Sequence, residues 1–322
     1  MKLATLNDGT PDGRLHVVSS DLGCAVAASG VETMQRLLEG WDALAPGLEA
    51  QYRALNAGNG EGALAFDPAT AMAPLPRAWQ WLDGSAFDSH GALMDAVFGI
   101  KKERTGRPLM YQGISDTFLG PCQTALFPSE ADDIDFEGEF GVITDRVPLG
   151  TSPEAAMGHI RLLVQINDWS LRRIAPIEMK TGFGWVQAKP PCSMAPVAVT
   201  PDEAGDAWRD GRLDLELLVD WNGNRFGAAN GYAMGFGFHE LVAHAAYSRT
   251  LVAGTVIGSG TVSNSNFRDV GSSCIAERRG IEIIDLGGPQ TPLRYGDTVR
   301  MEGRRRDGGV LFGAIEQSVD RA

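Results

Sequence analysis

The stretch that decides the fold reads Asp135-Phe136-Glu137-Gly138-Glu139-Phe140-Gly141-Val142-Ile143. If this stretch is extended, successive side chains point to opposite faces, so Glu137 and Glu139 lie on one face about 7 Å apart at the backbone. Two like charges at that separation repel each other, and a divalent cation between them relieves the repulsion. A solvated acidic edge explains the same pattern, because four more acids crowd residues 130–135. The stretch alone leaves both interpretations open.

The composition around this stretch favours a β-rich α+β fold. The chain has 322 residues, with 40 glycines and 17 scattered prolines, which suit short strands joined by tight turns. Residues 57–77 show neither the helical nor the strand period and resemble a linker or an extended arm. We therefore expect a small N-terminal β-containing domain at residues 1–75 and a larger domain at residues 76–322.

Local patterns predict several elements. The clearest is a hairpin whose first strand covers 213–219, followed by Asp220-Trp221-Asn222-Gly223-Asn224, because an Asn-Gly pair supplies the positive φ angles of a tight turn. Apolar spacing predicts helices over four ranges: 31–55 with an interruption at Pro46-Gly47, 90–103, 153–164 after a Ser152 cap, and 239–251.

Charge and cysteine content exclude several classes of protein. The formal net charge is −13 with a pI near 4.8, which argues against a nucleic-acid partner. No apolar run approaches the roughly 18 to 20 residues that cross a bilayer, so we expect no membrane partner. A polar turn follows the first few residues, which argues against a secretion signal. The four cysteines form no C-x-x-C pair, which argues against a zinc site or a disulfide scaffold and favours free thiols in a reducing cytoplasm.

Further candidates for chemistry lie outside the central stretch. Asp168 follows an apolar run, where an acid stands at the mouth of a core, although a helix or turn cap explains it equally well. Arg172 and Lys189 are cations that could hold an acidic substrate. His90 is one of only five histidines, the side chains best suited to moving protons near neutral pH, and a helix-start role is the alternative.

Six short motifs in order resemble the fumarylacetoacetate hydrolase family. They run from about residue 80 to residue 280 and cover most of the chain. The motifs are Asp83 with His90 seven positions on, Pro108-Leu109-Met110-Tyr111-Gln112-Gly113, Glu137-x-Glu139, Asn167-Asp168-Trp169-Ser170-Leu171-Arg172, Gln187-Ala188-Lys189-Pro190, and Gly258-Ser259-Gly260-Thr261-Val262-Ser263.

The resemblance implies a catalytic domain built as a mixed β-sandwich roll, and a homodimer. It also implies a divalent cation, magnesium or calcium with manganese as an alternative, held by hard oxygen ligands. The ligands implied are Asp83, Glu137, Glu139 and Asp168.

The resemblance also implies roles in catalysis. His90 would act as general base on water, while Lys189 and Arg172 would stabilise a developing enolate. Tyr111 and Thr261 would contact the substrate. Ser85 stands two positions after Asp83, where the animal enzymes carry a substrate-contacting tyrosine. Glu277 is the candidate acid that orients His90.

The function expected is hydrolysis of a carbon–carbon bond in a small anionic diketo or oxo acid, similar to fumarylacetoacetate or an acylpyruvate, in the catabolism of an aromatic compound. The alternatives on the same fold are a 2-oxo acid decarboxylase and an oxo-dienoate isomerase or hydratase. An alternative of another class is a binding protein that a metal stabilises and that turns nothing over.

Overall fold

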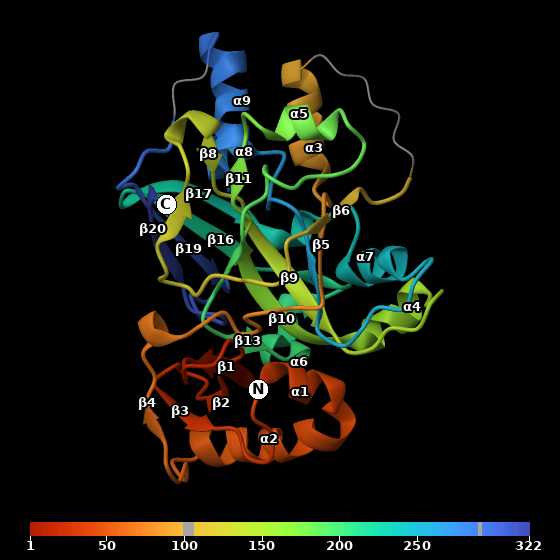
Figure 1. The fold of residues 1–322 in the computed structure, drawn as a ribbon, viewed down its shortest axis with the longest axis vertical. Coiled ribbons are helices and arrows are strands. Elements are labelled where there is room, and N and C mark those ends of the chain that lie inside the picture. Colours follow the sequence, from red (N-terminus) through yellow and green to blue (C-terminus); the bar gives the residue numbers. More distant parts are fainter. Residues whose placement is uncertain (99–105, 289–291) are drawn as a thin grey trace.

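A large mixed sheet runs through the molecule. The computed structural model describes residues 1–98, 106–288 and 292–322 (Figure 1). The sheet has the order β4-β3-β2-β1-β13-β10-β9-β18-β5-β6, and β12 pairs with β10 beside this path. Its strands are β1 (Lys2–Leu6), β2 (Arg14–Val18), β3 (Cys24–Ala27), β4 (Leu64–Ala65), β5 (Gln80–Gly84), β6 (Met110–Gly113), β9 (Gly138–Thr144), β10 (Ile160–Asn167), β12 (Ser193–Met194), β13 (Ala198–Val199) and β18 (Thr255–Gly258).

A second sheet packs against the middle of the first. Its order is β17-β16-β19-β20-β7, and two short strand pairs, β8 with β11 and β14 with β15, accompany the two sheets. The strands are β7 (Ala125–Phe127), β8 (Ile134–Asp135), β11 (Ser170–Leu171), β14 (Trp208–Arg209), β15 (Arg212–Leu213), β16 (Glu216–Trp221), β17 (Asn224–Asn230), β19 (Thr298–Arg304) and β20 (Ile315–Arg321).

Helices lie at both ends of this framework. Figure 1 shows α1 and α2 beside β1–β4 at one end, and α3, α5 and α9 together at the opposite end. No helix of the described ranges is long and apolar enough to cross a membrane. The helices are α1 (Met34–Glu39), α2 (Trp41–Asn56), α3 (Asp88–Phe98), α4 (Pro153–Ala156), α5 (Ala175–Met179), α6 (Pro201–Ala204), α7 (Phe238–Ala245), α8 (Phe267–Val270) and α9 (Ile275–Leu286).

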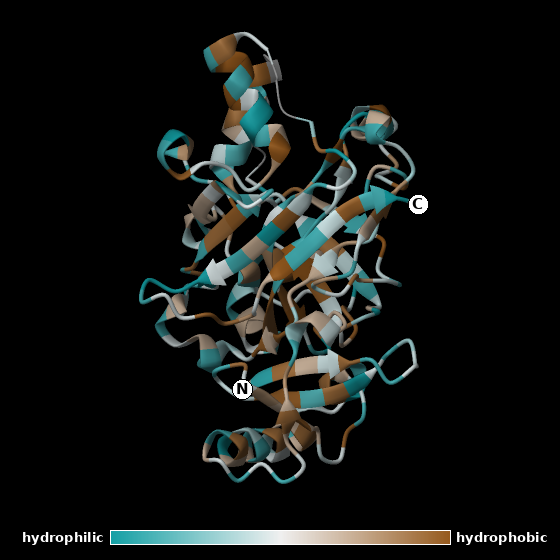
Figure 2. Cartoon of the chain, turned by 90° about the vertical axis from the view of Figure 1, so that its left-hand side faces the viewer, coloured by the Kyte–Doolittle hydropathy of each residue, from teal (hydrophilic) through white to brown (hydrophobic). Residues whose placement is uncertain are grey.

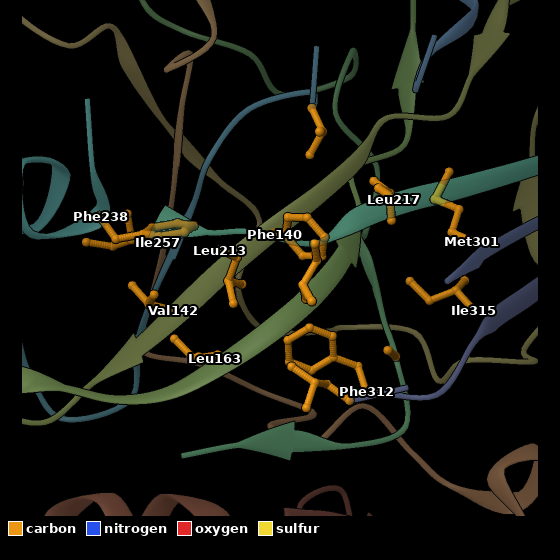
Figure 3. Packing of buried hydrophobic residues seen from close by; sticks show 14 of the residues in the cluster. Phe140, Val142, Leu163, Leu213, Leu217, Phe238, Ile257, Met301, Phe312 and Ile315 are labelled. Carbon is orange, nitrogen blue, oxygen red and sulfur yellow. The ribbon is translucent and has the colours of Figure 1, made fainter. Parts of the chain in front are cut away.

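The two faces of β9 serve different purposes. Phe140 and Val142 point into the core between the two sheets, where Phe140 lies near Phe312 with ring centroids 6.2 Å apart (Figure 3). Because side chains alternate along a strand, Glu139 points to the other face of β9. Figure 2 shows hydrophilic and hydrophobic residues following one another along the strands. The core thus fixes the face that β9 turns toward the candidate site.

The β-rich α+β class and the two-sheet architecture agree with the prediction from sequence. The hairpin is confirmed, since β16 and β17 pair across Asn222 and Gly223, whose φ angles are 50° and 75°. The large sheet also holds a feature that the sequence did not predict, because β1 pairs with β13 and joins residues 1–75 to the rest. The domain boundary at residue 75 stays a prediction.

Three helix predictions were wrong in detail. The helix expected over 239–251 ends early, because α7 stops at Ala245. The range 153–164 is helical only at its start, because Ile160 begins the strand β10, whose apolar residues are buried on both faces as in the interior of a sheet. The interruption expected at Pro46-Gly47 lies instead at Gly40, between α1 and α2, and α2 continues through Pro46. The helix expected over 90–103 is seen up to residue 98, and residues 99–103 lie outside the described part.

Candidate active site

Three carboxylates from three strands meet at one point. Asp83 lies in β5, Glu139 in β9 and Asp168 directly after β10, and one oxygen of each lies within 4.8 Å of the others. All three side chains are buried. We call Asp83, Glu139 and Asp168 the carboxylate cluster.

Strand pairing explains why the cluster forms. β18 lies between β9 and β5, and Gly258 pairs with Asp83 on one side and with Gly141 on the other. A Cβ at Gly258 would lie 2.4 Å from Oδ1 of Asp83 and 3.0 Å from Oε2 of Glu139. The absence of a side chain at Gly258 therefore leaves the space in which the carboxylates approach each other.

The electrostatics of the cluster favour the binding of a cation. Burial, and then the neighbouring carboxylates, raise the pKa values of Asp83 and Glu139 well above their usual range. Neither buried oxygen of Glu139 accepts a hydrogen bond from an N–H or hydroxyl group of the described residues, and the carboxyl group can share a proton only with its neighbour Asp83. An orphaned buried carboxylate is costly, and hard oxygen donors are the ligands that Mg²⁺, Mn²⁺ and Ca²⁺ prefer. The residues present therefore fit a divalent cation.

Asp168 is held by three donors. The hydroxyl of Tyr111 donates to Oδ2 at 2.7 Å and Nζ of Lys189 donates to the same oxygen at 2.6 Å. The thiol of Cys192 donates to Oδ1 at 3.0 Å. Burial alone would lower the pKa of Lys189, but Asp168 and Glu137 outweigh burial and hold it above its usual value. Lys189 therefore stays charged inside the site.

Glu137 lies beside the cluster but is not one of the three carboxylates that meet. Its Oε1 accepts hydrogen bonds from Ser170 at 2.6 Å, Arg172 at 2.7 Å and Lys189 at 2.9 Å, and its Oε2 accepts one from Thr261 at 2.6 Å. Burial opposes the ionised form of Glu137, but the positive charges of Arg172 and Lys189 outweigh burial and hold its pKa well below the usual range. Lys189 bridges Glu137 to the cluster.

A chain of contacts joins this region to helix α9. Arg172 donates to Asp135 at 2.7 Å, and Asp135 accepts hydrogen bonds from the backbone N–H groups of Ile275 at 2.7 Å and Ala276 at 2.9 Å. Asp135 thereby satisfies free donors in the first turn of α9. The backbone of Glu137 also forms a bridge with Cys274. The N-terminus of α9 is therefore anchored to the strand that carries the acids.

His90 and Glu277 form a hydrogen-bonded pair. Nδ1 of His90, in α3, lies 3.0 Å from Oε1 of Glu277, in α9. Glu277 is buried, and the side chain of His90 is 20% exposed. When Nδ1 donates to the carboxylate, Nε2 carries a free lone pair that can accept a proton. Sequence reasoning named Glu277 as the acid partner of His90, and the structure places the two in contact.

The remaining candidates divide into those at the site and one at its margin. Tyr111 and Thr261 contact the acids as described above. Ser85 is exposed, and its backbone N–H donates to Leu109 at 3.0 Å. Sequence reasoning missed Trp185 and Cys192. The Trp185 ring packs edge-on against Tyr111 with ring centroids 4.8 Å apart. Cys192 follows Lys189 by three positions, and this spacing is typical of no catalytic or metal-binding motif.

Two family models match the chain, and solved structures share its fold. Residues 80–320 match the family described as Fumarylacetoacetate (FAA) hydrolase C-terminal, and residues 1–77 match Fumarylacetoacetase N-terminal domain 2. A solved structure of maleylpyruvate hydrolase from Sphingobium sp. SYK-6, in complex with manganese(II) and pyruvate, superposes with a TM-score of 0.67 at 18% identity, over 100% of both chains. At that identity, the likeness shows a shared fold.

Two curated relatives match about half of the chain. The 2,4-didehydro-3-deoxy-L-rhamnonate hydrolase of Sphingomonas sp. (strain SKA58) is 27% identical over 157 residues, which are 48% of this chain and 52% of the relative. The mitochondrial oxaloacetate tautomerase FAHD2A of Homo sapiens is 24% identical over 162 residues, which are 48% of each chain. The chain thus spans about half the length of the curated relatives that it matches.

Proposed function

The chain belongs to the fumarylacetoacetate hydrolase family, and from that premise we propose that it is a divalent-metal-dependent hydrolase that cleaves a carbon–carbon bond in a small diketo or oxo acid. The observation that carries the proposal is the carboxylate cluster, in which Glu139 has no N–H or hydroxyl donor among the described residues, next to the charged Lys189. Cation, proton acceptor and anion-stabilising group are the parts that this reaction requires.

The cation would be held by Asp83, Glu139 and Asp168, with magnesium, manganese or calcium as candidates. We also propose Glu137 as a fourth ligand through Oε2, which accepts a hydrogen bond from Thr261. When bound, the ion would supply Lewis acidity that polarises the carbonyl group of the substrate. The maleylpyruvate hydrolase structure holds manganese and pyruvate, which supports the proposal of a divalent cation and an oxo-acid substrate.

We assign proton transfer to His90. Its Nε2 accepts a proton from water while Glu277 stabilises the imidazolium that forms. The hydroxide oxygen adds to the carbonyl carbon, the carbon–carbon bond breaks with its electron pair on the departing carbon, and the imidazolium of His90 returns its proton to that carbon. Lys189 stabilises the negative charge that develops on the departing fragment. Arg172 donates to Asp135 and Glu137, so we assign it to holding these acids in place.

The substrate would be a small anion. Because the protein itself carries a net charge of −13, attraction must come locally from the cation and Lys189. Tyr111 and Thr261 line the same region and are the proposed substrate contacts, together with the ring of Trp185. Ser85, which is exposed, would contact only the outer end of a longer substrate.

A second candidate within the family is proton transfer without hydrolysis, either without any cleavage, as in a tautomerase or an isomerase, or after the loss of CO2, as in a decarboxylase. The oxaloacetate tautomerase among the relatives favours it, since His90 and Glu277 can move a proton without water. A binding protein that holds only a structural cation would have no use for this proton-transfer pair. We therefore rank hydrolysis first and proton transfer second.

The test is an assay of acylpyruvates, fumarylpyruvate, fumarylacetoacetate and oxaloacetate with magnesium or manganese, with and without a chelator. We expect two acid products per cleaved substrate and no turnover in chelator. Turnover that needs no metal, or none on any oxo acid, would overturn the proposal, and enol–keto exchange without cleavage would favour the second candidate. Sedimentation equilibrium tests the proposed homodimer, and growth of a deletion strain on aromatic compounds tests the proposed catabolic role.

A further inference from the structure

A second group of metal-ligating side chains lies beside the carboxylate cluster. His90 from α3, Cys274 at the N-terminus of α9 and Glu277 in its first turn each offer one ligand atom, and these atoms lie within 4.8 Å of one another. Cys274 and Glu277 are buried, with exposed fractions of 0% and 1%, and His90 is partly exposed. Cys274 and Glu277 are therefore shielded from solvent, and an ion from solution can reach the group past His90.

The ligand types differ from those of the carboxylate cluster. A nitrogen, a sulfur and an oxygen donor together suit zinc, whereas three carboxylates suit hard cations such as Mg²⁺. Two ligands of one tetrahedral zinc lie about 3.3 to 3.6 Å apart. A spread of at most 4.8 Å is close to that requirement and needs only small side-chain shifts.

A second observation supports the binding of a cation at the same place. Oε1 of Glu277 faces His90, but its buried Oε2 accepts no hydrogen bond from any residue that the structure describes. A buried carboxylate oxygen without a donor is costly, and a bound cation satisfies it. The backbone is already in place, because Asp135 fixes the first turn of α9.

We propose that His90, Cys274 and Glu277 form a binding site for a thiophilic divalent cation of the zinc type, separate from the carboxylate cluster. Binding releases the thiol proton of Cys274 to solvent and leaves the fourth position for water.

Occupation of this site would inhibit the enzyme, a consequence that rests on the proposed function. Nδ1 of His90 faces Glu277 and is the nitrogen nearest to a cation held there. A ring that ligates through Nδ1 carries its proton on Nε2, so it has no lone pair left with which to accept a proton from water. Zinc would therefore stop proton transfer while the carboxylate cluster keeps its own cation.

The test uses the full-length protein with excess magnesium and with cobalt(II) as the spectroscopic substitute for zinc. We expect a thiolate-to-cobalt charge-transfer band that saturates at one equivalent and disappears on addition of zinc. Cys274→Ser should abolish the band, and it should fold, because serine is a favoured N-cap and can accept the Glu277 N–H as the sulfur does. Cys192→Ser is the matched control, since Cys192 is equally buried but contacts Asp168, and it should keep the band.

Two further measurements complete the test. Glu277→Gln should weaken the apparent zinc affinity at least about tenfold, because the loss of even an outer partner of a metal ligand costs that much. Zinc should inhibit turnover of the wild type in magnesium at least about tenfold more strongly than turnover of Cys274→Ser. A missing band, or a band that survives Cys274→Ser, would overturn the site. The band does not depend on turnover, so a chain that shows the band and turns over no oxo acid would refute the proposed function alone.

Discussion

The substitution Glu139→Gln should raise the free energy of unfolding of the metal-free protein and abolish the further stabilisation that a bound metal gives. One oxygen of Glu139 lies within 4.8 Å of oxygens of Asp83 and Asp168. At that limit and an effective dielectric of about 20, each pair of charges repels by about 3.5 kcal/mol. Proton uptake by the cluster absorbs most of this repulsion, so we expect a net gain of about 1 to 3 kcal/mol in the free energy of unfolding.

The sign of the pH dependence follows from the raised pKa of Glu139. Above the ordinary pKa, the unfolded carboxyl ionises freely, whereas the folded one must keep its proton or be repelled. The wild type therefore loses stability as the pH rises from the unfolded pKa toward the folded pKa, and glutamine removes this loss. The advantage of the variant should be larger at about pH 8 than at about pH 5.

Thermal and urea denaturation of metal-free and manganese-loaded protein measure both effects. Manganese at 100 times its dissociation constant should stabilise the wild type by about 2.7 kcal/mol, and should leave the variant almost unchanged. Glu302→Gln is the matched control, because Glu302 is also buried but pairs with Arg300 at 2.8 Å and Arg304 at 2.6 Å, so its loss should destabilise. The reasoning would be refuted if metal-free Glu139→Gln were less stable than the wild type and manganese still stabilised the variant as much as it stabilises the wild type.

The other predictions concern the neighbouring groups. His90→Ala should lower turnover about 100-fold to 10,000-fold and leave manganese affinity unchanged in calorimetry, and Glu277→Gln should have a smaller effect in the same direction; loss of metal binding in His90→Ala would show that its role is misassigned. Lys189→Met should destabilise the metal-free protein by about 3 to 5 kcal/mol in urea, because Glu137 and Asp168 lose a buried partner, and a loss under about 1 kcal/mol would contradict this. Manganese affinity should rise from about pH 5 to about pH 8 in calorimetry, since protons held by the two cluster carboxyls with raised pKa values compete with the ion; a flat profile would contradict this competition.

Local patterns predicted the parts of the fold that depend on neighbours in sequence. The Asn222-Gly223 turn was found because its backbone angles restrict the residue types that fit. The strand at 160–167 was missed because a continuous buried apolar run has no clear period and resembles part of a helix. The pairing of β1 with β13 is non-local, and no pattern within either strand predicts its partner.

In the candidate site, too, local spacing was predictable from the sequence and contacts between distant segments were not. The spacing of Glu137 and Glu139 predicted two acids on one face, but not that donors hold Glu137 while Glu139 lacks any among the described residues. That difference depends on Arg172 and Thr261, which approach from other strands and loops. Cysteine spacing argued against zinc, yet the fold brings Cys274 to His90, because a ligand set assembled from distant segments leaves no spacing signal.

Anomalous diffraction from crystals soaked in manganese tests the central claim most directly. The account predicts one strong manganese peak between Asp83, Glu139 and Asp168, at about 2.0 to 2.3 Å from an oxygen of each. A saturating soak that gives no peak there, or places the ion against other residues, would contradict the account.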